Sequence, residues 1–329
     1  RLLTLDPGTL LKVAGEEGNA YRVELSRNLS ASVPAEAVTL EETYPGKPYV
    51  VGNSVLDFPG RKIFFAVSGR VPAQVEYLSP SALKVIFYNA AVGTSEINLG
   101  SGECACRWEQ AEDGRAVFFL EGPLSCYRWS PAWRNGFFEL SWTGRPRGKE
   151  GRSVLIDPGH GGEQAGAVSP LGIEEKELNL LLARKVAERL TAAGVAALLT
   201  RENDSLVEVE KRVDFTRQSG VDLLVSIHFN SAAEFENPRE TSGFAVYHYH
   251  PPSLELARAL QRALGTLGLK DNGVRWKSLA VLRSPRLVSA LVEVAFLSNP
   301  EDESKIIAPD FLDRAAEAIA SGILAYLQD

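Results

Sequence analysis

The stretch Ser153-Val154-Leu155-Ile156-Asp157-Pro158-Gly159-His160-Gly161-Gly162 decides the fold of the C-terminal half of the chain. Its apolar start is typical of a buried parallel strand, and its glycine-rich end predicts a tight loop. The histidine therefore lies just beyond the carboxyl end of a strand, where open α/β sheets build their sites.

Strand and helix patterns alternate from residue 152 onward. An apolar stripe predicts the first helix, and a glycine at position 194 ends it. This alternation predicts a doubly wound α/β domain with a mostly parallel sheet and helices on both faces. The predicted strands are 153–156, 195–199, 222–228, 243–249, 279–283 and 289–295, and the predicted helices are 174–193, 207–219, 253–266 and 309–327.

The N-terminal half has a different pattern. Residues 1–45 contain short strands broken by turns, which predicts a small β module. Residues 46–143 alternate apolar and polar side chains with a turn about every ten residues, which predicts a β-sandwich. Residues 144–151 are polar and rich in glycine and basic side chains, so we expect a linker there and a separate domain at 152–329.

Composition excludes several classes of protein. The chain has 329 residues, 45% of them hydrophobic and 23% charged, as in a soluble globular protein. No apolar run approaches the roughly 18 residues of a membrane span. The net charge of −7 falls entirely in residues 150–329, which disfavours nucleic acid as a partner. The sequence starts at Arg1 and contains no Met, so we expect that an upstream segment, which could include an export signal, has been removed.

Three cysteines fall in the N-terminal half, at Cys104, Cys106 and Cys126. A bridge from Cys126 to one of the other two is one interpretation, because adjacent positions such as 104 and 106 pair poorly. Three reduced, buried cysteines are the alternative. A cysteine metal site is disfavoured, since no histidine lies in that half.

A second histidine, His228, ends the predicted strand 222–228, and the whole chain has only four histidines. Neutral imidazole is the commonest metal ligand, so His160 and His228 suggest a metal site. Glu174, Glu175 and Glu177 open the helix that follows His160. Each also has a structural explanation, because acidic side chains in a first helical turn complement the helix dipole.

Glu293 interrupts the apolar run 289–297, which predicts a central strand. A carboxylate there is costly unless it has a partner or a role. One interpretation is an ion pair with Arg283 or Arg286. The other is a general base, because burial raises a carboxyl pKa toward the range in which it transfers protons.

Four ordered blocks resemble the zinc-dependent N-acetylmuramoyl-L-alanine amidases of the type-3 family, across 152–329. The resemblance implies that zinc is held by His160, Glu175 and His228, and that Glu293 is the essential second glutamate. Glu175 is preferred over Glu174 because the family's Glu-Lys pair aligns with Glu175-Lys176. The blocks are Asp157–Gly162, Gly172–Asn179, Ser226–Ser231 and Val292–Asn299.

This resemblance implies a peptidoglycan hydrolase in which zinc-activated water cleaves the amide between N-acetylmuramic acid and L-alanine of the stem peptide. The alternatives are a zinc peptidase or carboxypeptidase acting on wall peptides, and a non-catalytic wall-binding protein. It also implies export to the periplasm or cell wall, with peptidoglycan as partner.

Two N-terminal resemblances add to this interpretation. Residues 46–143 resemble the AMIN module that precedes many cell-wall amidases, and residues 31–38 resemble the closing strand of a bacterial SH3-like barrel. We therefore expect the β region to position the enzyme at the wall, and it could bind a cell-envelope or cell-division protein.

Overall fold

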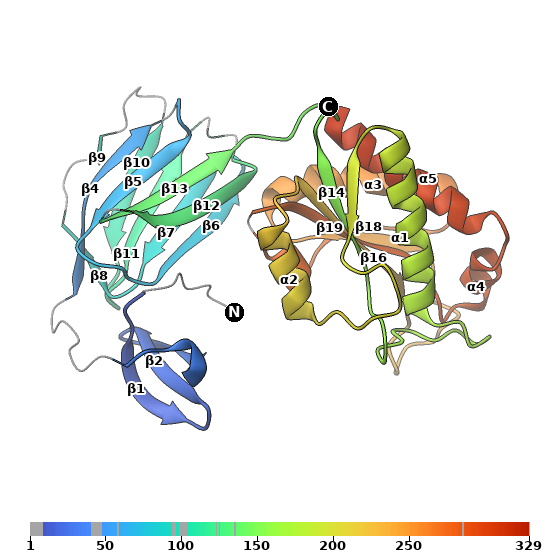
Figure 1. Cartoon of the computed structure of the whole chain (residues 1–329), viewed down its shortest axis with the longest axis horizontal. Helices are drawn as coiled ribbons and strands as arrows, with labels where there is room; N and C mark the ends of the chain where they lie inside the picture. The colour runs from blue at the N-terminus through green and yellow to red at the C-terminus, as the bar shows by residue number, and fades with distance from the viewer. Residues whose placement is uncertain are drawn as a thin grey trace. The chain divides into compact units, whose positions relative to one another are not determined.

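The computed structural model describes residues 9–40, 48–57, 59–93, 97–98, 104–122, 124, 126–134, 136–284 and 286–328. The chain forms two compact units, Arg1–Gly144 and Arg145–Asp329. Figure 1 shows the first unit built from strands and the second from a sheet with helices. The predictions of an all-β N-terminal region and an α/β C-terminal domain are confirmed.

The first unit begins with a small antiparallel sheet in the order β1-β2-β3. The predicted strand at 31–38 ends earlier, at Pro34, and a 3₁₀ turn at Ala35–Ala37 follows. Proline has no N–H to donate to a ladder, which explains the early end. The strands are β1 Lys12–Glu17, β2 Ala20–Ser26 and β3 Leu29–Pro34.

Two further sheets pack as a sandwich around aromatic side chains. Phe65, Phe87, Phe118 and Phe138 are buried, and their rings meet edge to face, as with 5.0 Å between the centroids of Phe65 and Phe118. One sheet has the order β10-β11-β7-β6, and the other β12-β13-β5-β4-β8 with β9 paired to β4. The strands are β4 Tyr49–Asp57, β5 Lys62–Val67, β6 Ala73–Ser79, β7 Ala82–Phe87, β8 Ala90–Val92, β9 Ile97–Asn98, β10 Ala105–Gln110, β11 Ala116–Glu121, β12 Arg128–Arg134 and β13 Phe137–Thr143.

No disulfide joins Cys104, Cys106 and Cys126, so the interpretation with a bridge from Cys126 is not supported, and Cys106 is partly exposed where the alternative has all three cysteines buried. Cys104 and Cys126 are buried in the sandwich core. The module limits 1–45 and 46–143 and their SH3-like and AMIN-like identities stay predictions. Residues 1–8 and 41–47 lie outside the described residues.

The second unit is a six-stranded sheet in the order β15-β14-β16-β19-β17-β18. The first four strands are mutually parallel, whereas β17 pairs antiparallel with β19 and parallel with β18. The strands are β14 Ser153–Pro158, β15 Ala196–Leu199, β16 Leu223–Asn230, β17 Phe244–His248, β18 Asp271–Trp276 and β19 Val288–Phe296.

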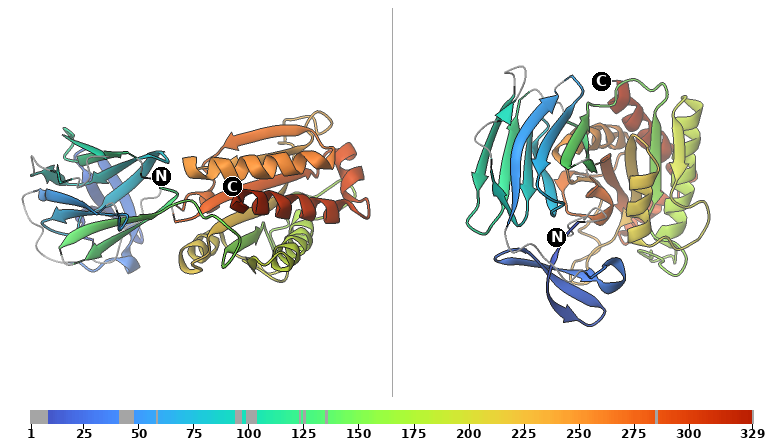
Figure 2. Two further views of the ribbon diagram at one scale, coloured as in Figure 1. Left: turned by 90° about the horizontal axis from the view of Figure 1, so that it is seen from above. Right: turned by 60° about the vertical axis from the view of Figure 1, so that its left-hand side comes forward.

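Helices cover both faces of this sheet (Figure 2). On one face α1 and α3 both pack against α5, and α2 lies on the other. Among the described residues, no helix is both long and apolar enough to cross a membrane. The helices are α1 Glu175–Ala192, α2 Val209–Gln218, α3 Leu254–Leu264, α4 Pro300–Ile306 and α5 Phe311–Gln328.

One predicted strand of this unit is wrong, and two elements were not predicted. The segment 279–283 is not a strand but contains a 3₁₀ turn at Ala280–Leu282, whose Val281 and Leu282 are buried against the sheet. The edge strand is instead β18, which is polar and partly exposed, so it lacks the apolar alternation by which strands are recognised. The short helix α4, capped by the Asn299 side chain, was not predicted.

Candidate metal centre

The loop after β14 carries His160 in a left-handed conformation. His160 has a φ of 61°, and Gly161 and Gly162 follow with φ of 134° and 56°. Two glycines after a strained histidine allow this sharp turn, because glycine has no Cβ to clash. Gly159 has a separate reason: a Cβ there would lie 2.1 Å from the His228 ring. The loop can therefore approach His228 only with glycine at this position.

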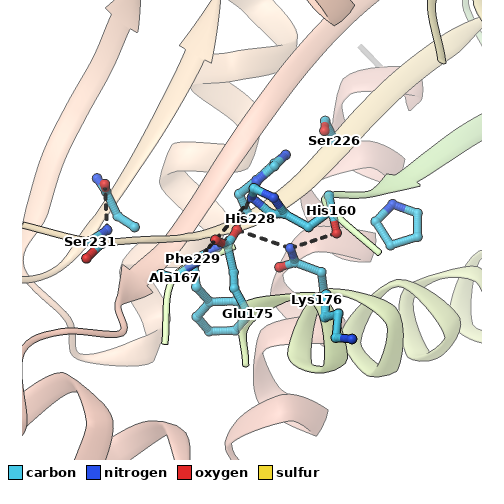
Figure 3. Close-up of polar contacts among 12 residues, drawn as sticks. His160, Ala167, Glu175, Lys176, Ser226, His228, Phe229 and Ser231 are labelled. Atoms are coloured by element: carbon cyan, nitrogen blue, oxygen red, sulfur yellow. Dashed lines mark hydrogen bonds and ion pairs between the residues drawn. The ribbon is translucent and has the colours of Figure 1, made fainter. Parts of the chain in front are cut away.

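Glu175, the first residue of α1, lies between the two histidines. Its Oε2 is 3.1 Å from His160 Nε2, and its Oε1 is 2.9 Å from His228 Nδ1. The three residues offer donor atoms that all lie within 4.8 Å of one another. Figure 3 shows Glu175 directed from its helix toward His228 at the end of β16. The structure thus brings together the three predicted ligands, which come from three separate elements.

The Glu175 carboxylate is buried and accepts several hydrogen bonds. Backbone N–H groups of Ala167 and Phe229 donate to it over 2.8 and 3.2 Å, and Asn179 Nδ2 donates over 3.1 Å. Burial alone would raise the pKa of Glu175, but the contacts with both histidines outweigh it and hold that pKa well below its ordinary value. Glu175 is therefore a fixed anion.

Glu174, the neighbouring candidate, lies elsewhere. Its carboxylate is 39% exposed and pairs with Lys176 at 3.2 Å. Gly166 also favours Glu175 as the group in the cluster, since a Cβ at position 166 would lie 2.4 Å from Glu175 Oε2. His248 and His250 lie outside the cluster, and His250 Nε2 instead contacts the Arg283 carbonyl at 2.8 Å.

A buried polar network holds the loop that carries His160. Asp157 pairs with Arg212 of α2, and it also accepts hydrogen bonds from Thr200 and Ser226. Arg212 and Arg201 donate to backbone carbonyls of the same loop, Arg201 to Gly159 and Arg212 to His160. Because the two guanidiniums donate to the carbonyls on either side of the His160 Cα, they fix the position of this histidine.

Sequence analysis missed Arg212 and gave no role to Asn179. Nothing in the sequence of α2 separates the buried Arg212 from its exposed neighbour Lys211. Asn179 Nδ2 joins Glu175 Oε1 to the Gly159 carbonyl, at 3.1 and 3.2 Å. Its position one helical turn after Glu175 was the available signal, since residues four apart share a helix face.

Glu293 lies on β19 directly opposite His228 of β16 in the parallel ladder. Its Oε2 is buried and has no hydrogen-bond partner in the described part of the chain. Burial raises the pKa of Glu293 to about 7, with His228 opposing and Glu175 reinforcing the shift. Within the described chain it forms no ion pair with Arg283 or Arg286, and Arg283 donates to Ser278 instead. The ion-pair interpretation is therefore wrong.

The three clustered side chains suit a zinc ion. Two imidazole nitrogens and one carboxylate oxygen are a donor set that zinc binds at about 2 Å each, with a fourth position open for catalysis. Donor atoms within 4.8 Å of one another can converge on such an ion. The hydrogen bonds from Ala167, Phe229 and Asn179 orient the carboxylate, as outer partners of metal ligands commonly do.

The sequence matches known proteins over the α/β unit. Residues 154–325 match the family model described as N-acetylmuramoyl-L-alanine amidase. The sequence is 35% identical over 178 residues to the N-acetylmuramoyl-L-alanine amidase LytC of Bacillus subtilis, covering 54% of this chain and 36% of LytC. It is 34% identical to the uncharacterized protein YqiI of the same organism, covering 54% of this chain and 85% of YqiI.

A solved structure gives the same result. The N-acetylmuramoyl-L-alanine amidase AmiC2 of Nostoc punctiforme matches with a TM-score of 0.52 and 36% identity, covering 56% of this chain and 99% of that one. The chain thus spans about a third of LytC and nearly all of the AmiC2 structure.

Proposed function

Because the chain belongs to the N-acetylmuramoyl-L-alanine amidase family, we propose that it is a peptidoglycan hydrolase that cleaves the amide between N-acetylmuramic acid and L-alanine of the stem peptide. The catalytic machinery lies in residues 145–329. The observation that carries the proposal is the row formed by His228 and Glu293, where a metal-donor cluster faces a buried carboxylate with a free oxygen.

His160, Glu175 and His228 would hold one zinc ion. When bound, zinc supplies a Lewis acid that polarises the scissile carbonyl and makes water easier to deprotonate. The chain's contribution is to hold the three donors in place. Gly159 and Gly166 leave room for them, and Arg201 and Arg212 fix the loop that carries His160.

Glu293 serves as the general base and then as the acid. Its free Oε2 takes a proton from the attacking water as the water oxygen bonds to the lactyl carbonyl carbon. The same proton passes to the alanine nitrogen as the C–N bond breaks, which leaves a lactyl carboxylic acid and a free amine. A carboxyl pKa raised to about 7 suits a group that must both accept and return a proton near neutral pH.

Mass spectrometry of digested sacculi tests this proposal. We expect stem peptides with a free L-alanine amino terminus, beside glycan that retains its lactyl carboxyl group. A chelator should abolish these products and added zinc should restore them. Full cleavage by metal-free protein would contradict the mechanism.

The same products separate the alternatives. A zinc peptidase would cut a peptide bond within the stem, and a carboxypeptidase would remove its C-terminal residue. Both would leave the lactyl amide intact. A non-catalytic wall-binding protein would give no products. Intact His160, Glu175, His228 and Glu293 favour a working enzyme over the latter.

We further propose that the protein acts outside the cytoplasm, in the periplasm or cell wall, where peptidoglycan lies. In this proposal the β unit positions the enzyme there and supplies no catalytic group, since it contains no histidine. It could bind a cell-envelope or cell-division protein. Pull-down of sacculi by residues 1–144 and by the full chain tests the wall-binding role.

A further inference from the structure

A polar pocket lies at the antiparallel edge of the α/β sheet. It has a volume of about 200 Å³ and is lined mainly by β17, β18 and the segments beside them, so we call it the β17–β18 pocket. A water molecule takes up about 30 Å³, so the pocket can hold a group the size of an amino acid. The residues used below are Asn230, Ala245, Tyr247, Lys270, Asn272 and Arg275.

The pocket adjoins the proposed active site. His228 pairs with Glu293, and Glu293 pairs with Ala245 on the next strand. Paired residues on neighbouring strands project from the same face of a sheet, so one row of side chains leads from the metal cluster to the pocket wall. Asn230, which also lines the pocket, lies two residues beyond His228. A substrate held at Glu293 can therefore extend into the pocket.

Two exposed cations, Lys270 and Arg275, line the pocket, and neither forms an ion pair among the described residues. Arg275 donates through Nε to the Asn272 carbonyl at 3.0 Å, and it lies beside the Tyr247 hydroxyl. Asn272 is held in turn, because its Nδ2 donates to the Ser242 carbonyl at 2.7 Å. Arg275 is thus positioned by neutral neighbours and forms no ion pair among the described residues.

The two acidic residues of the pocket, Glu236 and Glu240, form no ion pair with these cations among the described residues. Glu236 and Glu240 are exposed residues of the 231–241 loop. Glu236 accepts a hydrogen bond from the Ala233 backbone at 2.9 Å, and Glu240 accepts one from Asn237 at 2.9 Å. Each carboxylate is therefore hydrogen-bonded within its own loop, and the two cations lie on the wall formed by β18 and the residue before it.

The groups on the two sides of the scissile amide differ in charge, and this difference indicates which part of the substrate Lys270 and Arg275 can bind. The lactyl carboxyl is consumed in the amide, and the acetylated sugar that bears it is neutral. The stem peptide on the other side of the bond carries free carboxylates. Arginine binds carboxylates through paired hydrogen bonds of fixed geometry. The Arg275 guanidinium, one row of side chains from Glu293, therefore matches the peptide side of the substrate.

We propose that the β17–β18 pocket binds a carboxylate of the stem peptide through Arg275, assisted by Lys270 and Asn272. This proposal rests on the proposed amidase function and adds substrate choice to it. The pocket makes the enzyme prefer stem peptides that carry a free carboxylate over those in which the same group is a carboxamide. Arg275 is a specificity-determining residue and takes no part in proton transfer.

A substrate-by-variant cycle tests the proposal. Soluble muropeptides are prepared in three forms: with all carboxylates free, with a carboxamide at the residue after L-alanine, and with a carboxamide at the peptide's C-terminus. Values of kcat and KM are measured for the zinc-loaded wild-type chain, Arg275→Met, Arg275→Lys and the control Arg262→Met. Arg262 is an exposed cation on α3 outside the pocket.

We expect the wild type and Arg262→Met to prefer one free-carboxylate form over its carboxamide partner by roughly tenfold in kcat/KM, the low end for hydrogen bonds to charged groups. The carboxamide that lowers kcat/KM identifies the carboxylate that is bound. Arg275→Met should lose the preference mainly through KM, as expected when ground-state binding is removed. Arg275→Lys should retain part of it.

Three outcomes would overturn the proposal or its premise. Equal rates on all three substrates in the wild type would show that the pocket does not select a carboxylate, while the amidase proposal would stand. An equal fall on every substrate in Arg275→Met would show a purely structural role. Absence of lactyl-amide cleavage on any substrate would instead defeat the amidase proposal itself.

Discussion

The two units of this protein bury different kinds of side chain. The β-sandwich core consists mainly of aromatic and aliphatic residues around Phe65 and Phe118, and the buried Glu139 of this unit is paired with Lys62 at 3.0 Å. The α/β unit buries Asp157, Arg212 and Glu175 together at the carboxyl ends of its central strands. Buried polar groups cost free energy unless they are satisfied, so a concentration of them in one place marks where a fold is organised for chemistry.

The largest expected effect is on the metal cluster. His228→Ala removes one of three donors, so the full-length protein should lose both bound zinc and turnover. Metal content by atomic absorption and muropeptide cleavage should fall together. If the variant kept its zinc, other residues would hold the metal, and the proposed ligand set of the α/β unit would be wrong.

Glu293→Gln should separate catalysis from metal binding. The amide keeps the shape of the side chain but cannot take a proton, so turnover should fall by roughly 10²–10⁴-fold while zinc content is unchanged. Kinetics and metal analysis on one preparation measure both. Loss of zinc in this variant would make Glu293 a ligand.

Removing one partner of a buried ion pair should cost far more in the α/β unit than in the β unit. Arg212→Met leaves Asp157 buried and unpaired, so the free energy of unfolding should fall by about 3–5 kcal/mol. Lys62 is 41% exposed and Arg134 remains 3.6 Å from Glu139, so Lys62→Met should cost less than about 1 kcal/mol. Denaturation of full-length variants, followed by circular dichroism and tryptophan fluorescence, compares the two; similar costs would contradict the contrast.

Acid should weaken only the α/β unit through histidine. Burial lowers the pKa of His250 to about 4, whereas an unfolded histidine titrates near 6.5. Between these two pKa values the unfolded chain binds a proton at His250 and the folded chain does not. The contribution of His250 to stability therefore falls as the pH drops from about 6.5 toward 4. Relative to His250→Phe, the wild type should lose about 2–3 kcal/mol between pH 7 and pH 4.5. An unchanged difference across that range would show that His250 is accessible to protons.

The smallest effect is expected from removing the β unit. Residues 145–329 form their own compact unit with every proposed catalytic residue, so this fragment should cleave soluble muropeptides about as fast as the full chain. Activity on intact sacculi should fall if the β unit positions the enzyme. A folded but inactive fragment would contradict the division of labour.

The central strands and their terminal residues could be predicted because local pattern decides them. Apolar runs followed by His160 and His228 need no tertiary information. The resemblance to a family, and not spacing, distinguished Glu175 from Glu174. Their different surroundings, one buried between two histidines and the other exposed beside Lys176, became visible only in three dimensions.

Other features depended on contacts between distant segments. Arg212 reaches Asp157 from 55 positions later in the chain, and the charge of Arg275 gains meaning only from the strands beside it. The run 279–283 had the composition of a strand but packs on the face of the sheet, while polar β18 takes the edge. Intrinsic propensity describes the secondary structure that a segment favours by itself. Packing against the rest of the fold decides which segment forms the edge strand.

The segment just before β14 is fastened to the last turn of α5. The Gly148 N–H donates to the Leu327 carbonyl at 2.7 Å, Arg145 Nη2 donates to the Tyr326 carbonyl at 3.0 Å, and the Arg145 guanidinium lies over the Tyr326 ring. The entry into the α/β unit and its final helix are thus neighbours at the amino ends of the parallel strands, opposite the metal cluster. Such an arrangement suits circular permutation and insertion into other proteins, because the two segments lie next to each other and at the end of the strands opposite the metal cluster. Evolution and protein engineering can therefore exchange what is attached to this unit without redesigning the site.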